Sequence, residues 1–378
     1  MHSDPAPIAG TIASAGVQRR RRWAGERLGY APRPVTAPVV SVSGLTKIYK
    51  VHERTTGLGA TFRSLVRRKY KDVPAVAGIE FGIASGEIVG FLGPNGAGKT
   101  TTLKMLSGLL FPTGGDAQVM GHVPWSREDR FLRRMTLLMG NRTQLVWDIP
   151  AADSFLVLKQ IYGIGDAQFT ETLDELTELL ELGPLLHKPV RQLSLGERMK
   201  VEFAAGLLHR PEVVFLDEPT LGLDVSMQAR IRTFIKELNR RSGATILLTS
   251  HYMDDIVALC RRVIVIHHGK ILYDGGLTDL AERMAPYKIV GATLRDGAIG
   301  RDLSAYGDVV SNENGLVKLR VPRADAAERT ARLVRDLEGG LADLSLEDPP
   351  IEEVIDRVFS GEKLDDHRPA AVPEGAVR

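Results

Sequence analysis

The stretch GPNGAGKTT has the residue types and spacing of a loop that binds phosphate. It follows the pattern G-x-x-x-x-G-K-[ST], with an apolar run (IVGFL) before it and a helix-like run (TTLKMLSGLL) after it. Its glycines let the backbone curl so that successive N–H groups point at one set of phosphate oxygens. Lys99 would reach the β- and γ-phosphates, and the Thr100 hydroxyl would complete a Mg²⁺ shell. The expected contacts are Gly93, Pro94, Asn95, Gly96, Ala97, Gly98, Lys99, Thr100 and Thr101.

A carboxylate pair and a histidine follow two further apolar runs. Asp217 and Glu218 come directly after VVFL, and His251 follows ATILLTS. Buried parallel strands deliver such side chains to one edge of a sheet, where the ligands of α/β proteins bind. We expect Asp217 to hold Mg²⁺ through water, Glu218 to polarise an attacking water, and His251 to hydrogen-bond the γ-phosphate.

A second loop, LSLGE, also has the character of an anion site. It begins at Leu193 and opens into a run typical of a helix, RMKVEFAAGLL. A helix N-terminus offers free backbone N–H groups and a favourable dipole to a phosphate. One chain therefore carries two loops suited to phosphate, a hundred residues apart.

The elements that must position these groups are visible as apolar patterns. Short apolar runs that lead into the loops predict strands of a sheet buried on both faces. Before them, VVSVSGL alternates like a strand and predicts the first strand. Between the first and second loops, Phe169, Leu173, Leu176 and Leu180 recur with a helical period, which predicts a helix with one apolar face.

Composition bounds the possible functions. The chain has 378 residues, and 49 basic against 47 acidic side chains give a formal charge of +2, so no overall attraction to nucleic acid is expected. The single cysteine, Cys260, excludes an internal disulfide. No apolar run approaches the roughly eighteen residues of a membrane span, so work at a membrane would require a partner.

In order and spacing these motifs resemble those of the ATP-binding cassette (ABC) ATPases, over about 39–285. The resemblance implies that two cassettes pack head to tail around ATP and Mg²⁺. Each ATP would lie between the phosphate loop of one copy and the LSLGE loop of the other. Ser194 and Gly196 would then clamp the opposing γ-phosphate, Asp224 would link the two sites, and Tyr49 would stack on adenine.

Two departures from the family pattern concern the site. The usual LSGGQ loop reads LSLGE, so Leu195 replaces a glycine and Glu197 adds a negative charge, for which Arg198 is the candidate counter-ion. The glutamine expected after the strand MTLLM falls on Asn141, which would contact Mg²⁺ and the water. Gln144, three residues on, is the alternative.

The resemblance extends to a subfamily and to the domain organisation. The segments GNRTQLVWDIP, VRQLSLGERMK and TSHYMDDI resemble the ATPases of ABC-2 type exporters, which act with separate permeases. The expected fold is an α/β P-loop cassette with a mixed sheet and a helical subdomain, followed by a small α/β region. The expected divisions are a basic tail at 1–38, the cassette at 39–285 with its helical subdomain at about 142–205, an accessory domain at 286–362 and a tail at 363–378.

The sequence thus predicts the ATP-hydrolysing subunit of an exporter. Its partners would be a second copy of itself and an ABC-2 type permease, with no nucleic acid, and it would work at the cytoplasmic face of the cell membrane. The alternative is a soluble ABC ATPase that serves DNA repair or translation. The insertion at 51–73, which separates the first strand from PAVAGIEF, has a basic amphipathic pattern suited to a permease or to anionic headgroups.

Overall fold

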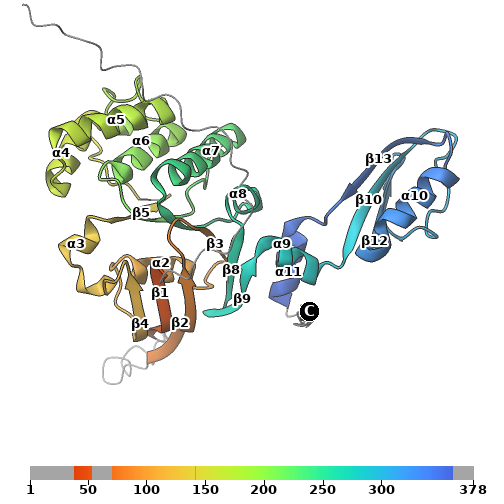
Figure 1. Ribbon diagram of the computed structural model, residues 1–378, viewed down its shortest axis with the longest axis horizontal. Coiled ribbons are helices and arrows are strands. Elements are labelled where there is room, and N and C mark those ends of the chain that lie inside the picture. Colours follow the sequence, from red (N-terminus) through yellow and green to blue (C-terminus); the bar gives the residue numbers. More distant parts are fainter. Residues whose placement is uncertain (1–37, 53–69, 141, 361–378) are drawn as a thin grey trace, which may run out of the picture. The chain divides into compact units, whose positions relative to one another are not determined.

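The computed structural model describes residues 38–52, 70–140 and 142–360 (Figure 1). The expectations for Asn141, for most of the 51–73 insertion and for nearly all of both tails therefore lie outside the described residues.

A six-stranded sheet forms the centre of the cassette. All neighbouring strands in it are parallel except the last pair. Short apolar runs such as VVFLD become strands here because a parallel sheet is covered on both faces. In spatial order the strands are β5 (Met135–Met139), β6 (Val213–Asp217), β7 (Thr245–Thr249), β3 (Ile88–Leu92), β8 (Arg262–His267) and β9 (Lys270–Gly276).

This sheet separates two hydrophobic cores. Along β6, Val214 and Leu216 belong to one buried cluster, while Val213 and Phe215 belong to the other. The alternation follows from the period of two in a strand. The first cluster takes in the helices that follow β5, and the second takes in the phosphate-loop helix and an antiparallel sheet.

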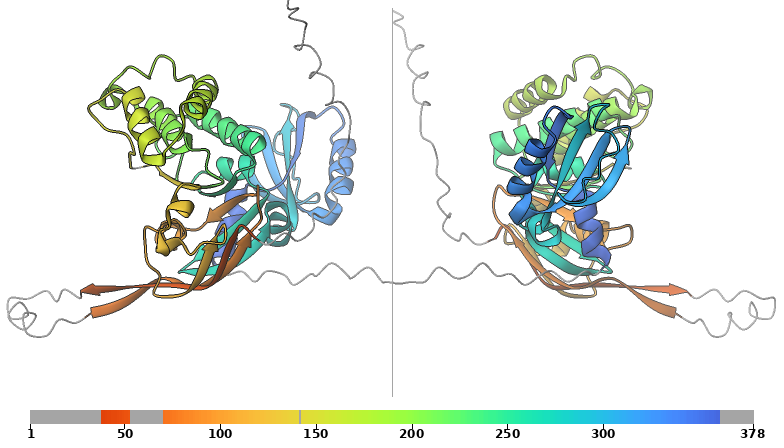
Figure 2. Two further views of the ribbon diagram at one scale, coloured as in Figure 1. Left: turned by 60° about the vertical axis from the view of Figure 1, so that its left-hand side comes forward. Right: turned by 90° about the vertical axis from the view of Figure 1, so that its right-hand side faces the viewer.

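The antiparallel sheet has three strands in the order β2 (Tyr70–Ile83), β1 (Val40–His52) and β4 (Gly114–Val119). The pairing of β1 with β2 continues to His52 opposite Tyr70, and Figure 2 shows the two strands side by side along this length. The sequence predicted a first strand over VVSVSGL only. Both ends of the 51–73 insertion are in fact strand, because each pairs with the other.

Helices follow most of the sheet strands. The expected apolar face of α5 (Asp166–Leu180) is confirmed, since Phe169, Leu176 and Leu180 are buried and Leu173 packs against the same cluster. α4, α5 and α6 lie between β5 and β6 in the chain. Figure 1 shows these three helices together as a helical layer. The helices of the cassette are α2 (Lys99–Leu106), η1 (Pro124–Ser126), α3 (Asp129–Leu132), α4 (Ala151–Tyr162), α5 (Asp166–Leu180), η2 (Val190–Gln192), α6 (Leu195–Leu207), α7 (Val225–Ser242), α8 (Met253–Leu259) and α9 (Leu277–Met284).

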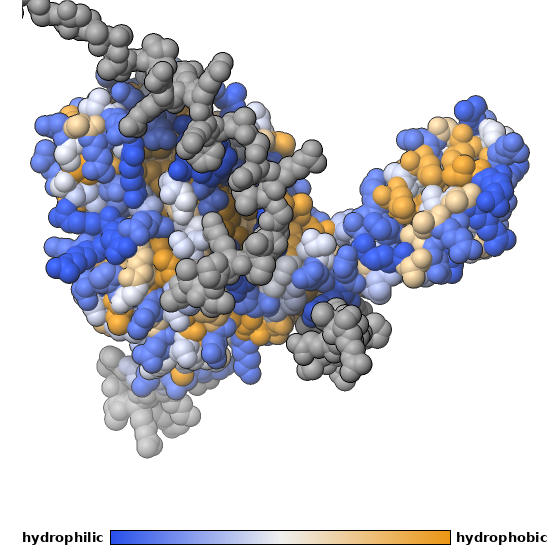
Figure 3. Space-filling model, viewed as in Figure 1, coloured by the Kyte–Doolittle hydropathy of each residue, from blue (hydrophilic) through white to orange (hydrophobic). Residues whose placement is uncertain are grey.

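The C-terminal region contains a four-stranded antiparallel sheet with its own apolar cluster, which includes Leu333 of α10 (Ala326–Asp336). Apolar side chains also gather on its surface in Figure 3. The last helix, α11, instead packs against α9 and shares its cluster. The elements are β10 (Tyr287–Leu294), β11 (Asp308–Glu313), β12 (Leu316–Pro322), η3 (Arg323–Asp325), α10 (Ala326–Asp336), β13 (Leu341–Glu347) and α11 (Ile351–Ser360).

Among the helices of the described residues, none combines the length and apolar character needed to cross a bilayer.

Candidate active site

The phosphate loop runs from the end of β3 to the start of α2, as its motif predicts. Two of its glycines admit no side chain. A Cβ on Gly93 would come within 2.2 Å of the Ile266 carbonyl oxygen. Gly98 has φ of 112°, and a Cβ there would come within 2.5 Å of the Ala75 oxygen. The loop can therefore approach neighbouring backbone closely only with glycine at these positions.

Lys99 is held against its own loop. Its Nζ donates to the carbonyl oxygens of Gly93 (2.6 Å) and Pro94 (3.3 Å). Burial lowers the pKa of Lys99, while the negative charges of Glu218 and Asp217 raise it. The ammonium is thus placed beside the curled N–H groups, where phosphate oxygens would provide stronger partners than carbonyls do.

Thr100 and Asp217 come together although they are far apart in the sequence. The Thr100 hydroxyl lies 2.9 and 3.0 Å from the two carboxylate oxygens of Asp217. Thr249, at the end of β7, donates its hydroxyl to the same carboxylate at 2.9 Å. A hydroxyl and a carboxylate are the hard oxygen donors that Mg²⁺ takes beside substrate phosphates, so these residues fit that ion.

Glu218, which follows Asp217 in the chain, lies next to His251. The backbone N–H of His251 donates to Glu218 Oε2 at 2.9 Å, and His251 Nε2 lies 3.3 Å from Oε1. Glu218 has φ of 54°, which is unusual for a residue with a side chain, and the Thr249 hydroxyl accepts from its N–H at 3.1 Å. Oε1 is buried and has no hydrogen-bond partner among the described residues, so it could accept a proton from a water.

Burial raises the pKa of Glu218, and this has a measurable consequence for stability. The folded protein keeps this proton at pH values where the unfolded chain has lost it, so stability falls as pH rises from 4.5 through the raised value. Glu218→Gln removes that loss. We expect the melting temperature of this variant, relative to the wild type, to be higher at pH 7 than at pH 4.5.

Glu212→Gln provides a control of opposite sign. Glu212 stands just before β6, and its hydrogen bond with Arg134 lowers its pKa. That stabilisation is present above the ordinary pKa of 4.5 and fades as pH falls, so this variant should lose stability relative to wild type at pH 7. Curves for Glu218→Gln and wild type that stay parallel at every pH would contradict the assignment.

The segment after β5 contains Gln144 and contacts Glu202, a residue that the sequence analysis did not single out. Gln144 directs its side-chain amide to the Leu137 carbonyl at 3.3 Å, and not to Thr100 or Asp217. Glu202, on α6, is buried and accepts from the Gln144 N–H at 3.0 Å and from the Thr143 hydroxyl. A lone acid in an apolar helix face was its only signal in the sequence. It joins this segment to the helix of the second loop.

The second loop caps a helix, as predicted. Ser194 is the N-cap of α6 and forms a capping box with Glu197: the Glu197 N–H donates to the Ser194 hydroxyl, and the Ser194 N–H donates to the Glu197 carboxylate at 2.9 Å. The Ser194 hydroxyl accepts in this box, so its proton stays available for a phosphate. Gly196 lies against Met227 of α7, where an added Cβ would be 3.1 Å from the methyl group.

The negative charge of Glu197 is balanced by other groups than the arginine that the sequence predicted. Arg198 does not pair with it but lies 5.4 Å from the centre of the Trp147 ring. The capping hydrogen bond from the Ser194 N–H lowers the pKa of Glu197, and Lys188 lies 3.4 Å away. The proposed role of Arg198 was wrong because a glutamate at this helix position satisfies itself locally.

The two remaining candidate site residues, Asp224 and Tyr49, lie at the start of α7 and within β1. Asp224 is the N-cap of α7, and its carboxylate accepts from the Met227 N–H at 2.9 Å. Tyr49 lies on β1 and is 39 % exposed as a residue, with Lys47 Nζ 5.5 Å from the centre of its ring. An exposed ring face is what stacking on a base requires.

Comparisons with known proteins agree with this geometry. Residues 76–221 match the family model for an ABC transporter, and residues 286–347 match that for the C-terminal domain of an EvrA-like ABC transporter. The ATP-binding protein NatA of Bacillus subtilis is 36 % identical over 214 residues, which cover 57 % of this chain and 87 % of the relative. The chain belongs to the ABC transporter ATP-binding proteins.

Further relatives show which ABC ATP-binding proteins this chain resembles. A daunorubicin resistance ATP-binding protein, DrrA3 of Streptomyces coeruleorubidus, is 32 % identical over 294 residues, or 76 % of this chain and 92 % of the relative. The linearmycin resistance ATP-binding protein LnrL of Bacillus subtilis is 31 % identical over 229 residues, covering 61 % and 73 %. The ABC ATPase and its place in the exporter group are therefore confirmed, and nothing here favours the soluble alternative.

Solved structures confirm the fold class. The ATP-binding subunit of an ABC transporter superposes with a TM-score of 0.53 at 23 % identity, covering 64 % of this chain and 92 % of the other. A dimeric cassette bound to ADP and Pi gives a TM-score of 0.52 at 23 % identity, covering 63 % and 98 %. The P-loop ABC cassette with a mixed sheet was predicted correctly.

Proposed function

We propose that this ATPase drives an ABC-2 type permease at the cytoplasmic face of the membrane, as a head-to-tail pair. Each ATP lies between Gly93–Thr101 of one copy and the Ser194 loop of the other. The carrying observation is that these two loops stand on different parts of the fold. α2 packs on β2, β4, β6 and η1, whereas α6 packs on β5, α4 and α5. A homodimer suffices because one chain supplies both kinds of half-site.

In this proposal the residues at the start of α2 and at the ends of β6 and β7 each perform one step of ATP hydrolysis. Thr100 and Asp217 hold Mg²⁺, with Asn141 as its proposed third contact, and the ion neutralises charge on the phosphates. Glu218 orients a water through Oε1, which has no hydrogen-bond partner among the described residues, and takes its proton, because a raised pKa makes the carboxylate a stronger base. The His251 N–H holds that carboxylate in place, and its imidazole contacts the γ-phosphate.

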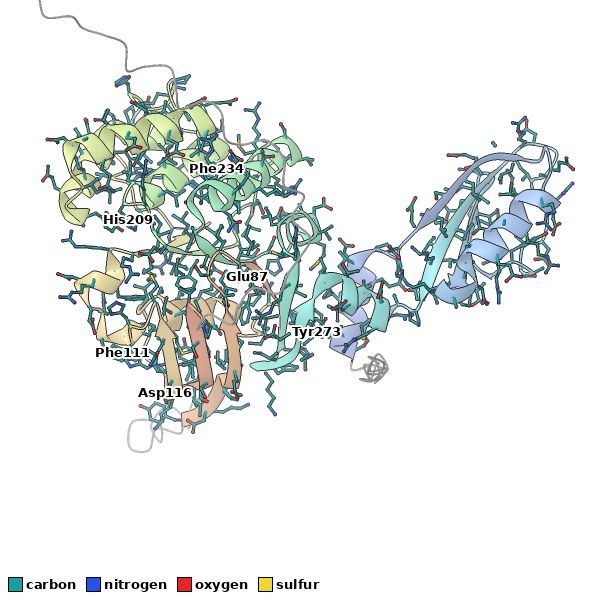
Figure 4. The ribbon with its side chains drawn as sticks, in the orientation of Figure 1. Glu87, Phe111, Asp116, His209, Phe234 and Tyr273 are labelled. Carbon is teal, nitrogen blue, oxygen red and sulfur yellow. The ribbon has the colours of Figure 1, made fainter. Side chains whose placement is uncertain are left out.

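A groove beside the phosphate-loop helix supports docking of the permease. It has a volume of about 420 Å³ and lies where β5, α4 and the segment after α2 meet. Leu109 and Ile161 line it and are 57 % and 62 % exposed. Tyr162 closes one side, stacked at 4.0 Å on His209, which is labelled in Figure 4. Exposed apolar walls of this kind suit the end of a partner helix.

Ile161→Asp should prevent recovery of the permease. The charge would enter the apolar wall of the groove. ATP binding by the purified variant should be unchanged, because none of the residues Gly93–Thr101 lines this groove. The test is affinity purification of the tagged chain from detergent-solubilised membranes, followed by identification of any polytopic protein. Val257→Asp, at an equally exposed position on α8, is the control and should keep the partner. Equal recovery with both variants would refute the docking surface.

We further propose the domain division at 39–285 and 286–362, with α11 as a helix that returns to α9. The relatives' names concern resistance to daunorubicin and linearmycin, so amphiphilic compounds are the first class of cargo to test with the reconstituted permease.

A further inference from the structure

A cavity of about 410 Å³ lies where α5, α6 and α7 meet. None of the residues assigned to ATP or to the permease groove lines it. Its floor is apolar, formed by the buried side chains of Leu180, Ile231 and Phe234. Phe234, labelled in Figure 4, is fixed by an edge-on contact with Phe203 at 5.4 Å. The floor is therefore preformed, as ligand sites usually are.

One end of this cavity carries an excess of positive charge. Lys200 is only 8 % exposed, and its Nζ lies 3.1 Å from Glu181 Oε2. Arg230 Nη1 lies 2.5 Å from the same oxygen atom. Two cations thus share one carboxylate, whose pKa they lower through the hydrogen bond from Lys200 first. Glu237, at the rim, does not offset this excess because it pairs with Arg240 and Arg241.

Glu181 is a replaceable partner for these cations. Its side chain is 65 % exposed, and its backbone has φ of 55°, so it ends α5 in a conformation that side chains seldom adopt. An exposed carboxylate gives a buried ammonium a weak, solvent-screened partner. A ligand carboxylate entering from the cavity could meet Lys200 and Arg230 with less exposure to water.

We propose that this cavity is a regulatory binding site for a small amphiphilic anion. Its apolar body lies on Leu180, Ile231 and Phe234, and its carboxylate pairs with Lys200 and Arg230. The match rests on both the apolar floor and the surplus charge at one end. A neutral or cationic amphiphile of the same size would leave that surplus uncompensated.

The location gives such a ligand an effect on ATP turnover. α5 and α6 belong to the inserted helical layer, while α7 follows the core strand β6. Two ion pairs already connect these parts, Arg230 with Glu181 and Arg241 with Glu175 at 3.5 Å. A ligand that pairs with Lys200 and Arg230 replaces the first of these bridges, and its apolar body joins all three helices. We therefore expect it to slow turnover by stiffening the junction between the helical layer and α7. This regulatory half rests on the proposed function; the binding itself does not.

Titration with decanoate tests the binding. Isothermal titration calorimetry on the full chain should show one saturable site, while decyltrimethylammonium should not bind. Ala229→Trp, at an exposed lining position, should abolish the decanoate signal by filling the mouth. Arg230→Gln should weaken binding about tenfold, since it removes a charged hydrogen bond. Lys236→Gln, at an exposed position on the same helix that does not line the cavity, should bind like wild type.

The opposite results are clear. Absence of a decanoate signal, or equal binding of the cation, or no effect of Ala229→Trp, would overturn the site.

For regulation, ATP hydrolysis of each protein is compared with its own rate without decanoate. The wild-type rate should fall at saturation, and that of Ala229→Trp should not. A wild-type rate that is unaffected at full occupancy overturns the regulatory role, whereas a wild type without ATPase activity overturns the proposed function instead.

Discussion

Glu218→Gln should lower kcat for ATP hydrolysis by about 10²–10⁴-fold, the usual contribution of a general base. Gln keeps the size of the side chain and can still accept from the His251 N–H, but it cannot take a proton from water. Binding of ATP should persist, because Lys99 and the loop N–H groups are unchanged. Phosphate release by the permease-bound complex measures the rate, and equilibrium binding of labelled ATP measures the affinity.

A glutamate-to-glutamine substitution at the start of β6 is the control that separates an effect on chemistry from an effect on folding. Glu212 stands before β6 and forms an exposed ion pair with Arg134, so Glu212→Gln should hydrolyse ATP at the wild-type rate. Wild-type protein in complex with its permease should also exceed Glu218→Gln by the factor above. Equal rates for wild type and Glu218→Gln would show that Glu218 does not activate the water.

Lys99→Ala should raise the Kd for ATP by at least about tenfold. The ammonium lies within the curled loop, bonded to Gly93 and Pro94, and each charged hydrogen bond it transfers to phosphate is worth about 1.5–3 kcal/mol. Hydrolysis should be lost as well, because the same charge stabilises the transferring phosphoryl group. Labelled ATP binding and phosphate release are the two measurements.

Lys104→Ala is the matched control on the same helix. Lys104 lies in the last turn of α2, remote from the loop N–H groups, so its loss should leave the Kd for ATP within about twofold. An unchanged Kd in Lys99→Ala, with normal melting behaviour, would mean that phosphate binds elsewhere.

Local signals predicted where most residues of the candidate site would lie. The glycines at Gly93 and Gly98 predict the loop because no side chain fits their surroundings, and apolar runs predict β6 and β7 because parallel strands are buried on both faces. With strand ends placed at one sheet edge, the neighbourhood of Thr100, Asp217 and Glu218 follows.

What the sequence missed depends on contacts between distant segments. Glu202 was not singled out, because its role appears only when α6 lies beside the segment after β5. The counter-charge of Glu197 was assigned to its neighbour Arg198, although the capping geometry and Lys188 supply it. The length of β1 was underestimated, since polar residues near His52 become strand only through pairing with β2.

The most direct measurement concerns the shared nucleotide. Two differently tagged chains, Lys99→Ala and Ser194→Asp, are mixed, and the heterodimer is isolated through both tags. Asp is as good an N-cap as Ser, so α6 should persist, while its charge repels the γ-phosphate. Each homodimer should be inactive, but the heterodimer keeps one complete pairing, the loop of the Ser194→Asp chain with Ser194 of the Lys99→Ala chain. We predict one ATP bound and hydrolysed per heterodimer; activity no higher than that of either parent would contradict a site built from two chains.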